Sequence, residues 1–375
     1  MRGGANVMEC SYHAQGLCHS CPTIDMPYEE QLKAKEEQVK ALLPHAQWHE
    51  STPSPIEAFR NKAKMAVLGY AHAPILGIVN HAGIEVSLVN CPLYTPSMRA
   101  LLAHIERWVK VSGIRPYRIE KRQGALKYVI VTQNSEDSFM VRLVVASRDA
   151  IERIQSFQKA LIEGYPIEVL SVNIQPVHMA VLEGEEEHFL SDTQALIEVM
   201  NEVPLYMAPQ SFFQTNTQVT RALYATARAW VEPLDAKSIW DLFCGVGGFG
   251  LSVSTPETQL WGIEIAPHAI AHAQESARAL GITQVRFEAL DASLVAQNIA
   301  PDVVIVNPPR RGIGEALCST LESLAPLHIL YSSCNATTLA QDLARLSHYR
   351  IDQAQLFDMF PHTYHYEVLV LLKRI

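Results

Sequence analysis

Short apolar runs, in which apolar and polar positions alternate, fill the chain from about residue 56 to residue 205. Alternation with a period of two is typical of half-buried strands, and the short spacing between the runs is typical of an antiparallel sheet. The pattern therefore predicts an α+β domain, a sheet with a few helices. The runs are KMAVLGY, LGIVNH, KYVIVTQ, MVRLVVAS and IEVLSVNIQPVHM.

Two segments of this half depart from the strand pattern. Residues 96–113 carry apolar residues at helical spacing, begin at Pro96 and end at Gly113, which predicts a helix. The acidic run VLEGEEEHFL is expected to be a hairpin tip or a solvated loop.

From about residue 206 the pattern changes to strands that alternate with helices. SIWDLF is followed by a glycine-rich turn and a helix, and LWGIEI by the helical run AIAHAQESARAL. This order predicts a Rossmann-like α/β domain, a parallel sheet with helices on both faces. Further strands are expected at VRFEAL, PDVVIVN and LHILYSS, and QAQLFDMF and YEVLVLL are expected to pair at the sheet edge. We divide the chain into regions 1–205 and 206–375.

Composition excludes several classes of protein. Apolar residues make up 48% of the 375 positions and charged residues 18%, with a mean hydropathy of +0.04, as in globular proteins. No apolar run is long enough to cross a membrane, and the N-terminal stretch lacks the apolar core of a secretory signal. We expect a cytoplasmic protein without a membrane or an obligate protein partner, and a monomer.

The net charge of −9 argues against a protein that coats nucleic acid. A local basic groove remains compatible with it, because steering follows the local field. Two basic segments are candidates for binding phosphates, residues 59–64 (FRNKAK) and residues 107–127, or are solvated basic faces.

The glycine-rich turn at residues 241–250 (DLFCGVGGFG) is the first strong chemical signal. A strand that runs into such a turn lets a ligand approach the backbone closely. Glu264 ends the next strand, where a carboxylate accepts hydrogen bonds from ribose hydroxyls, and Asp291 ends the third, near an adenine amino group. The turn also satisfies GxGxxG, so NAD is a rival ligand. Asp241 would repel a pyrophosphate and hold an ammonium group, which favours S-adenosylmethionine; a turn used only for packing is the third interpretation.

Two loops at strand ends carry further candidate residues for the ligand site. Residues 307–312 (NPPRRG) follow the fourth strand and face the ligand crevice, or form a purely structural turn. In methylases of nitrogen atoms an aromatic residue usually follows the two prolines; Arg310 stands there, which disfavours nitrogen as the acceptor. Cys334 in YSSCN is a candidate nucleophile on the same edge, whereas Cys244 and Cys318 are interpreted as core or loop thiols.

The segment FDMFPHTYHYE near the C-terminus is dense in polar groups. Glu367 enters the last apolar run and is either a partly buried carboxylate with a raised pKa, useful as a base, or an exposed strand-end carboxylate. For His362 and His365 we prefer a role in orientation or plain hydrogen bonding.

Four cysteines in the first half form a candidate metal site. A reducing cytosol makes structural disulfides unexpected. Three thiols on one loop and a remote fourth suit a [4Fe–4S] cluster, with a structural zinc ion as the competitor. The four are Cys10, Cys18, Cys21 and Cys91.

Together these motifs resemble those of the RNA 5-methyluridine methyltransferase family, in particular its bacterial branch that acts on 23S rRNA. The resemblance extends from Cys10 to Glu367 and rests on the cysteine pattern and on FRNKAKM, SFFQTN, DLFCGVGGFG, VNPPRRGIG, YSSCN and DMFPHTYHYE. Almost nothing precedes Cys10, so the N-terminal β-barrel of larger relatives is expected to be missing. The resemblance implies a C-terminal methyltransferase domain that uses S-adenosylmethionine and an N-terminal α+β RNA-binding domain that carries an iron–sulfur cluster.

The resemblance also implies roles for individual residues. Cys334 matches the nucleophile and Glu367 the base, and the cluster ligands match the four cysteines. The methyl-donor site matches Gln214, Phe243, Glu264, Asp291 and Asn307. Many relatives have Asp where this chain has Asn307; the 23S branch resembles this chain in carrying Asn.

The implied chemistry explains these residue types. Attack of a Cys334 thiolate on C6 of uracil makes C5 nucleophilic enough to take a methyl group, after which Glu367 removes the C5 proton. The base must leave the RNA stack to react. The alternatives are methylation of another rRNA or tRNA uracil, an Asn-Pro-Pro nitrogen methyltransferase, an RNA-binding iron–sulfur protein without activity, and an iron–sulfur redox enzyme.

Overall fold

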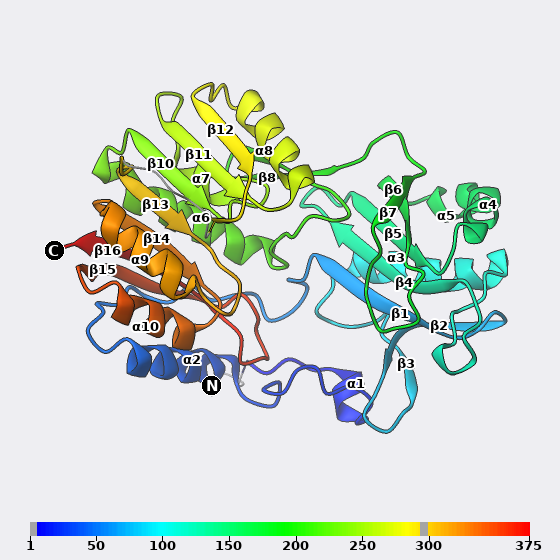
Figure 1. Cartoon of the computed structure of the whole chain (residues 1–375). Coiled ribbons are helices and arrows are strands. Elements are labelled where there is room, and N and C mark those ends of the chain that lie inside the picture. Colours follow the sequence, from blue (N-terminus) through cyan, green and yellow to red (C-terminus); the bar gives the residue numbers. More distant parts are fainter. Residues whose placement is uncertain (1–5, 293–298) are drawn as a thin grey trace.

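The computed structural model describes residues 6–292 and 299–375, which form two seven-stranded sheets and a two-stranded hairpin (Figure 1). The helices are α1 (Ser11–Ala14), α2 (Tyr28–Leu42), α3 (Pro96–Ser112), α4 (Asp149–Ser156), α5 (Gln158–Ile162), α6 (Thr217–Val231), α7 (Gly248–Val253), α8 (Pro267–Ala279), α9 (Gly314–Leu324) and α10 (Ala336–Arg345), with 3₁₀ turns at Ile119–Lys121 and Glu232–Leu234. The strands of the first half are β1 (Lys62–Tyr70), β2 (Ala73–Val79), β3 (Glu85–Ser87), β4 (Leu126–Gln133), β5 (Phe139–Val145), β6 (Ile167–Ile174), β7 (Glu186–Phe189), β8 (Leu196–Met200) and β9 (Val203–Met207). The second half contains β10 (Ser238–Leu242), β11 (Gln259–Glu264), β12 (Val285–Ala289), β13 (Val303–Val306), β14 (His328–Ser333), β15 (Tyr349–Phe357) and β16 (Glu367–Arg374).

The first sheet has the order β3-β2-β1-β4-β5-β6-β7 and is antiparallel except between β5 and β6. The helix expected at residues 96–113 is α3. It begins because the Thr95 side chain accepts a hydrogen bond from the Met98 N–H, and it ends at Gly113, whose φ of 69° is left-handed. α3, α4 and α5 pack their apolar faces on this sheet, so the predicted α+β pattern is confirmed for the first half.

The acidic run VLEGEEEHFL is in part a strand, so the expectation of a loop was wrong for its second half. β7 pairs with β6, with Phe189 opposite Ser171. The acidic charge is tolerated because Arg142, whose side chain is only 3% exposed, forms ion pairs with Glu183 and Glu187. A buried cation on β5, two strands away in the same sheet, thus compensates a charge pattern that is typical of a solvated loop.

The second sheet has the order β12-β11-β10-β13-β14-β16-β15. Its first five strands are parallel, and β16 and β15 add an antiparallel edge, as the sequence predicted. α6, α7 and α8 bury their apolar faces on one side of the sheet, and α9 and α10 on the other. Strand order reverses between β10 and β13, so the ligand crevice of this fold lies at the carboxyl ends of the central strands.

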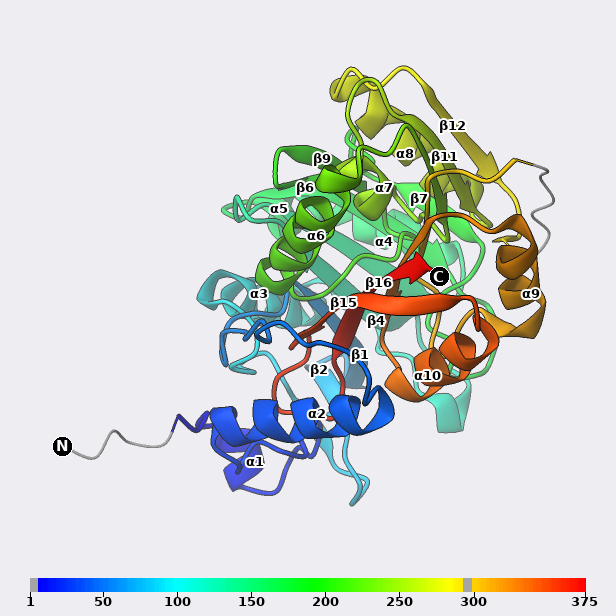
Figure 2. The same cartoon turned by 90° about the vertical axis from the view of Figure 1, so that its left-hand side faces the viewer.

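The N-terminal segment crosses from one half to the other (Figures 1 and 2). α2 lies beside α10, and Val39 and Leu43 belong to the core of the second sheet. The chain then runs along β15, where Trp48 and Thr52 form isolated bridges, and enters the first sheet at β1. The described residues contain no helix that is long and apolar enough to span a membrane.

Candidate functional site

The glycine-rich turn lies between the end of β10 and α7, as expected. Phe243, Gly245 and Gly247 all have positive φ angles, of 67°, 54° and 92°. A side chain at position 247 would also be crowded, because a Cβ there would lie 2.8 Å from a methyl carbon of Leu251. The turn therefore exposes backbone to a ligand at the carboxyl end of the central strand.

Asp241, near the end of β10, holds this turn through a hydrogen bond. Its Oδ2 accepts a hydrogen bond from the Gly250 N–H at 2.8 Å, and its Oδ1 is buried without a hydrogen-bond partner among the described residues. Burial raises the pKa of Asp241 to about 7, with Glu264 adding to the rise and the Gly250 N–H opposing it. Oδ2 of Asp241 thus holds the turn, and Oδ1 lies beside the turn and can still accept a hydrogen bond.

Glu264 and Asp291 follow neighbouring strands. Glu264 ends β11 and accepts a hydrogen bond from the Gly245 N–H at 3.1 Å, so its carboxylate is fixed against the turn. A carboxylate held there retains a second oxygen for a ribose hydroxyl. Asp291 lies two residues beyond the end of β12 and is exposed.

Cys334 and Glu367 lie on adjacent antiparallel strands. Ser333 of β14 is opposite Val368 of β16, so Cys334, one residue beyond Ser333, faces Glu367, one residue before Val368. Burial raises the pKa of the half-buried Cys334 thiol; Glu367 adds to the rise and Arg310 opposes it. The two predicted residues are therefore neighbours in space although 33 positions separate them in the sequence.

Glu367 is a buried carboxyl group, 3% exposed. Its Oε1 accepts a hydrogen bond from the Ser332 hydroxyl at 2.6 Å. Burial raises the pKa of Glu367 to about 7, and the Ser332 hydroxyl opposes that rise. The interpretation as a buried base, rather than an exposed strand-end carboxylate, fits this environment.

The NPPRRG loop reaches the same edge from β13. The backbone carbonyl of Arg310 accepts hydrogen bonds from Asn335 Nδ2 at 3.1 Å and Thr338 Oγ1 at 2.8 Å, which ties the loop to the start of α10. The Arg310 guanidinium lies 3.2 Å from Nδ1 of His365. Asn307 is half-buried directly after β13.

Gln214 lies in the connection between β9 and α6. Asn61, in the first half of the chain, holds this connection: its Nδ2 donates to the Gln214 carbonyl at 2.9 Å, and its backbone N–H donates to the Thr215 carbonyl at 2.8 Å. Asn216 caps α6 through the Val219 N–H. Phe212 projects from the same connection and is 77% exposed.

The four cysteines of the first half line one cavity of about 150 Å³. Burial raises the pKa of Cys21 to about 12 and that of Cys91 to about 11, and the thiols of Cys10 and Cys18 contribute to both rises. Within residues 6–292 and 299–375, no three His, Cys, Asp or Glu side chains are grouped tightly enough to hold a metal ion. Four thiols around a cavity are a donor set that fits an iron–sulfur group, which binds thiolates. The four are Cys10, Cys18, Cys21 and Cys91.

Other predicted residues have structural roles. Cys244 and Cys318 are buried in the cores, as interpreted. His362 makes plain hydrogen bonds, with Nε2 2.7 Å from the Ile56 carbonyl oxygen. In the basic segment 107–127, Arg118 pairs with Glu85 and Lys127 is buried, so part of this charge is used inside the protein.

Sequence reasoning missed the residues that support the site. Ser332 holds Glu367, and the buried pair Lys35 and Asp358 lies beneath the segment that leads to it. The sequence held a weak signal that Lys35 is buried. It falls on the same helical face as Tyr28 and Val39, where a lysine is unexpected.

Comparison with known proteins gives consistent results. Residues 191–375 match the family model described as tRNA (Uracil-5-)-methyltransferase. The Vibrio cholerae protein named 23S rRNA (uracil(747)-C(5))-methyltransferase RlmC is 51% identical, over 98% of this chain and 100% of its own length. The protein of the same name from Escherichia coli O9:H4 is 48% identical, over 97% and 99%.

A solved structure is similar over nearly the whole chain. It is the Pyrococcus abyssi tRNA (uracil-54, C5)-methyltransferase in complex with S-adenosyl-L-homocysteine, with a TM-score of 0.82 and 25% sequence identity. The likeness covers 98% of this chain and 85% of that one, so it includes both sheets and the N-terminal segment.

Proposed function

The chain belongs to the RNA (uracil-C5)-methyltransferase family, and on that premise we propose that it transfers a methyl group from S-adenosylmethionine to C5 of a uracil in 23S rRNA. The full-length relatives are named for uracil 747, and we infer the same target for this chain. The observation that carries the proposal is the meeting of Cys334 and Glu367 at the strand edge that also holds the glycine-rich turn. A thiol and a buried carboxyl group there are the two groups that C5 methylation requires.

In this proposal Cys334 is the nucleophile. Its thiolate attacks C6 of the uracil, which pushes the electron pair of the C5–C6 double bond onto C5 and O4 as an enolate. S-adenosylmethionine supplies the methyl group that C5 then accepts. The positive charge of Arg310 opposes the rise in the pKa of the thiol that burial causes, and so favours the reactive thiolate.

Glu367 completes the cycle as the base. Its carboxylate takes the C5 proton, the electrons of that C–H bond re-form the C5–C6 double bond, and the Cys334–C6 bond breaks to return the thiolate. A pKa raised to about 7 suits a group that must accept a proton near neutral pH. Atoms and charges balance, so no oxidant or reductant is needed.

The methyl-donor site is proposed at the turn. Glu264 would accept hydrogen bonds from the ribose, and Asp291 would lie on the adenine side. The fixed position of Glu264 on the Gly245 N–H supports this assignment, as does the S-adenosyl-L-homocysteine, the demethylated donor, bound in the Pyrococcus protein. Gln214, Phe243 and Asn307 complete the proposed set.

We further propose that the four-cysteine cavity holds a [4Fe–4S] cluster. The cluster would be bound by the thiolates of the four cysteines and serve a structural role, because methyl transfer moves no electrons. We propose that the β-rich half, residues 1–205, contacts the RNA, and that the protein acts in the cytoplasm as a monomer. Iron and sulfide analysis of anaerobically purified protein tests the cluster; Cys91→Ser should lose both, and a zinc content of one per chain would contradict it.

Tritium release tests the main proposal. We would label 23S rRNA at uracil C5, from cells that lack the modification, and measure tritium released to water with and without S-adenosylmethionine. Release that depends on the donor and is lost in Cys334→Ala is expected. Methyl transfer without tritium release in the wild type would instead favour a nitrogen acceptor, and RNA binding without methyl transfer would favour a protein that only binds.

A further inference from the structure

The loop of residues 358–366 between β15 and β16 runs directly into Glu367. β15 fixes Glu367 on one side, opposite Phe357, but the 358–366 loop has no strand partner of its own. What holds this loop therefore adds to the strand pairing of β16 and to the Ser332 hydrogen bond in setting where the Glu367 carboxyl group lies.

Lys35 of α2 holds the loop at three points. Its Nζ donates to Asp358 Oδ1 at 2.6 Å, to the Phe360 carbonyl at 3.0 Å and to the His365 carbonyl at 2.7 Å. An ammonium group has three protons, so all three donors of Lys35 are used. The ion pair is buried, with side-chain exposures of 5% for Lys35 and 0% for Asp358. The two carbonyls span the loop up to two residues before Glu367.

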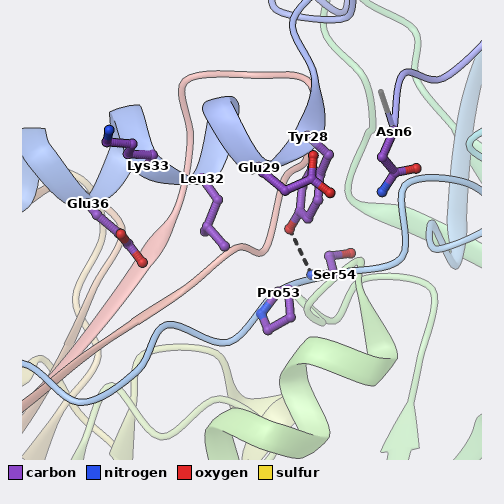
Figure 3. A pocket seen from close by; sticks show the side chains of 8 residues that line it. All are labelled: Asn6, Tyr28, Glu29, Leu32, Lys33, Glu36, Pro53 and Ser54. Atoms are coloured by element: carbon purple, nitrogen blue, oxygen red, sulfur yellow. Dashed lines mark hydrogen bonds between the residues drawn. The ribbon is translucent and has the colours of Figure 1, made fainter. Parts of the chain in front are cut away.

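Tyr28 joins the same α2 helix to the loop from the side. Its hydroxyl donates to Asp358 Oδ2 at 2.7 Å and accepts from the Ser54 N–H at 2.9 Å. Figure 3 shows Tyr28 pointing from α2 toward Ser54, which lies in the segment that leads to β1. Both oxygens of Asp358 are thus occupied, and the loop cannot shift without breaking a buried bond.

The network continues to the methyl-donor side. Asn216 Nδ2 donates to Ser54 Oγ at 2.8 Å and to the Met359 carbonyl at 3.2 Å. Asn216 lies two residues after Gln214 and caps α6. The loop that carries the base and the connection that carries Gln214 are therefore held by one buried set of hydrogen bonds.

At its other end the loop contacts Arg310, a cation that acts on the thiol of Cys334. His365, whose carbonyl Lys35 holds, lies with its Nδ1 3.2 Å from the Arg310 guanidinium, and Arg310 is the cation that opposes the rise in the pKa of Cys334 caused by burial. A shift of the loop would move Glu367 and loosen Arg310 together.

We propose that Lys35 is a positioning residue for the elimination step, because it fixes the 358–366 loop so that the Glu367 carboxylate reaches the C5 proton of the methylated adduct. The inference rests on the proposed function. It assigns a role in catalysis to an N-terminal helix that contributes no reacting group. Elimination is the sensitive step, since an error of about 1 Å in the position of a base costs roughly 100-fold in rate.

The experiment compares two radioactive readouts in one reaction. Methyl incorporation into RNA reports methyl transfer, and tritium release from C5 reports proton removal by Glu367. Lys35→Met keeps an unbranched side chain one atom shorter than lysine but donates no hydrogen bond. We expect tritium release to fall about 10- to 100-fold in single turnover while methyl incorporation falls less. The uneliminated product should accumulate as a protein–RNA adduct that survives denaturing gel electrophoresis.

Two further variants separate positioning from stability. Lys33→Met changes an exposed lysine of the same helix and should behave as the wild type. Lys35→Met alone leaves Asp358 charged and buried, which lowers stability. Lys35→Met combined with Asp358→Asn removes that charge and keeps an acceptor for Tyr28; it should be more stable than the single variant but accumulate the adduct equally.

The outcomes are distinct. Recovery of tritium release in the double variant, or an equal fall of both readouts in Lys35→Met without adduct, would overturn the role of Lys35 and leave the wild-type activity standing. Absence of tritium release from the wild type would remove the proposed function and this inference with it. Adduct in Lys35→Met and in the double variant, but not in Lys33→Met, would support the inference.

Discussion

At the scale of single residues, burial gives Glu367 the acid–base property that its proposed role as a base needs. The carboxyl group is buried, and its pKa is raised to about 7. Only the carboxylate form can take the C5 proton, so tritium release in single turnover should rise about tenfold per pH unit below pH 7 and level off above it. Glu367→Gln should abolish this pH dependence together with release. A rate that is flat between pH 5.5 and 7.5 would contradict the assignment.

The same burial predicts a pH effect on stability. The folded-state pKa of Glu367 lies above the unfolded value of about 4.3, so between these two pH values the folded state holds a proton that the unfolded state has lost. Stability contributed by the protonated group is therefore lost as pH rises through this window. Glu367→Gln should gain up to about 3 kcal/mol relative to the wild type by pH 8. At pH 4 the difference in urea unfolding should vanish; an equal gain at both pH values would point to another cause.

Residues that carry chemistry could be recognised in the sequence more readily than residues that support them. Cys334 follows an apolar run that had to be a strand, and Glu367 precedes one, so both were expected at a sheet edge. Lys35 was not found, because α2 is rich in charged residues and its buried face is short. A lysine there is paired with a residue 323 positions away, which no local pattern reveals.

At the scale of elements, α10 positions the NPPRRG loop through one carboxylate. Asp342 Oδ2 accepts hydrogen bonds from the Tyr331 hydroxyl at 2.6 Å and from the Ile313 N–H at 2.9 Å. Gly312 admits no side chain, since a Cβ there would lie 2.4 Å from Asp342 Oδ2. The end of the loop is thus fixed between β14 and α10.

Asp342→Ala should therefore destabilise the fold and loosen the loop. It leaves the Tyr331 hydroxyl and the N–H groups of Ile313 and Gly314 without their partner, at about 1–3 kcal/mol each, and should raise the KM for the RNA substrate. Arg345→Ala removes the more exposed partner of Asp342 and should cost less than about 1 kcal/mol. Urea unfolding and steady-state kinetics of the two variants test this; equal losses would mean that the ion pair, not the loop contacts, matters.

Elements were predicted best where local chemistry and tertiary packing agree. Thr95, Pro96 and Gly113 mark the ends of α3, and the helix is apolar on the face that it buries. β7 was missed because a run of glutamates is unusual in a strand. Ion pairs of Glu187 with Arg142 of β5, two strands away, and of Glu186 with Arg148 make these glutamates compatible with one. Compensation of charge between strands depends on the register of the sheet, which the sequence does not display.

At the scale of the whole molecule, the N-terminal segment is where the sequence was least informative. The division into regions 1–205 and 206–375 follows the change of hydrophobic pattern and stays a prediction. α2 nevertheless packs on the second sheet, and its Val39 lies in that core. No change in composition marks the point where a chain crosses from one core to another, so such a segment is found only in three dimensions.

The two halves are also joined by a buried carboxylate, Glu198 of β8. Its Oε2 accepts a hydrogen bond from the Ser135 N–H at 2.7 Å, in the turn between β4 and β5, and its Oε1 pairs with Arg221 of α6 at 2.7 Å. Asn134 of the same turn donates to the Ile197 carbonyl at 3.0 Å. Ser135 belongs to the first sheet and Arg221 packs with the second, so Glu198 connects the proposed RNA-binding half to the catalytic half.

Glu198→Ala should therefore separate binding of the RNA from binding of the donor. Loss of the carboxylate leaves the Ser135 N–H unpaired and should lower stability by about 1–3 kcal/mol. Because the glycine-rich turn lies at the end of β10 in the second sheet, affinity for S-adenosylmethionine should stay unchanged. The KM for RNA, which we propose contacts both halves, should rise. Arg221→Ala removes a partly exposed partner and serves as the milder control. Calorimetry with the donor and kinetics with the RNA measure the two effects, and an equal loss of both affinities would show that Glu198 supports the catalytic half alone.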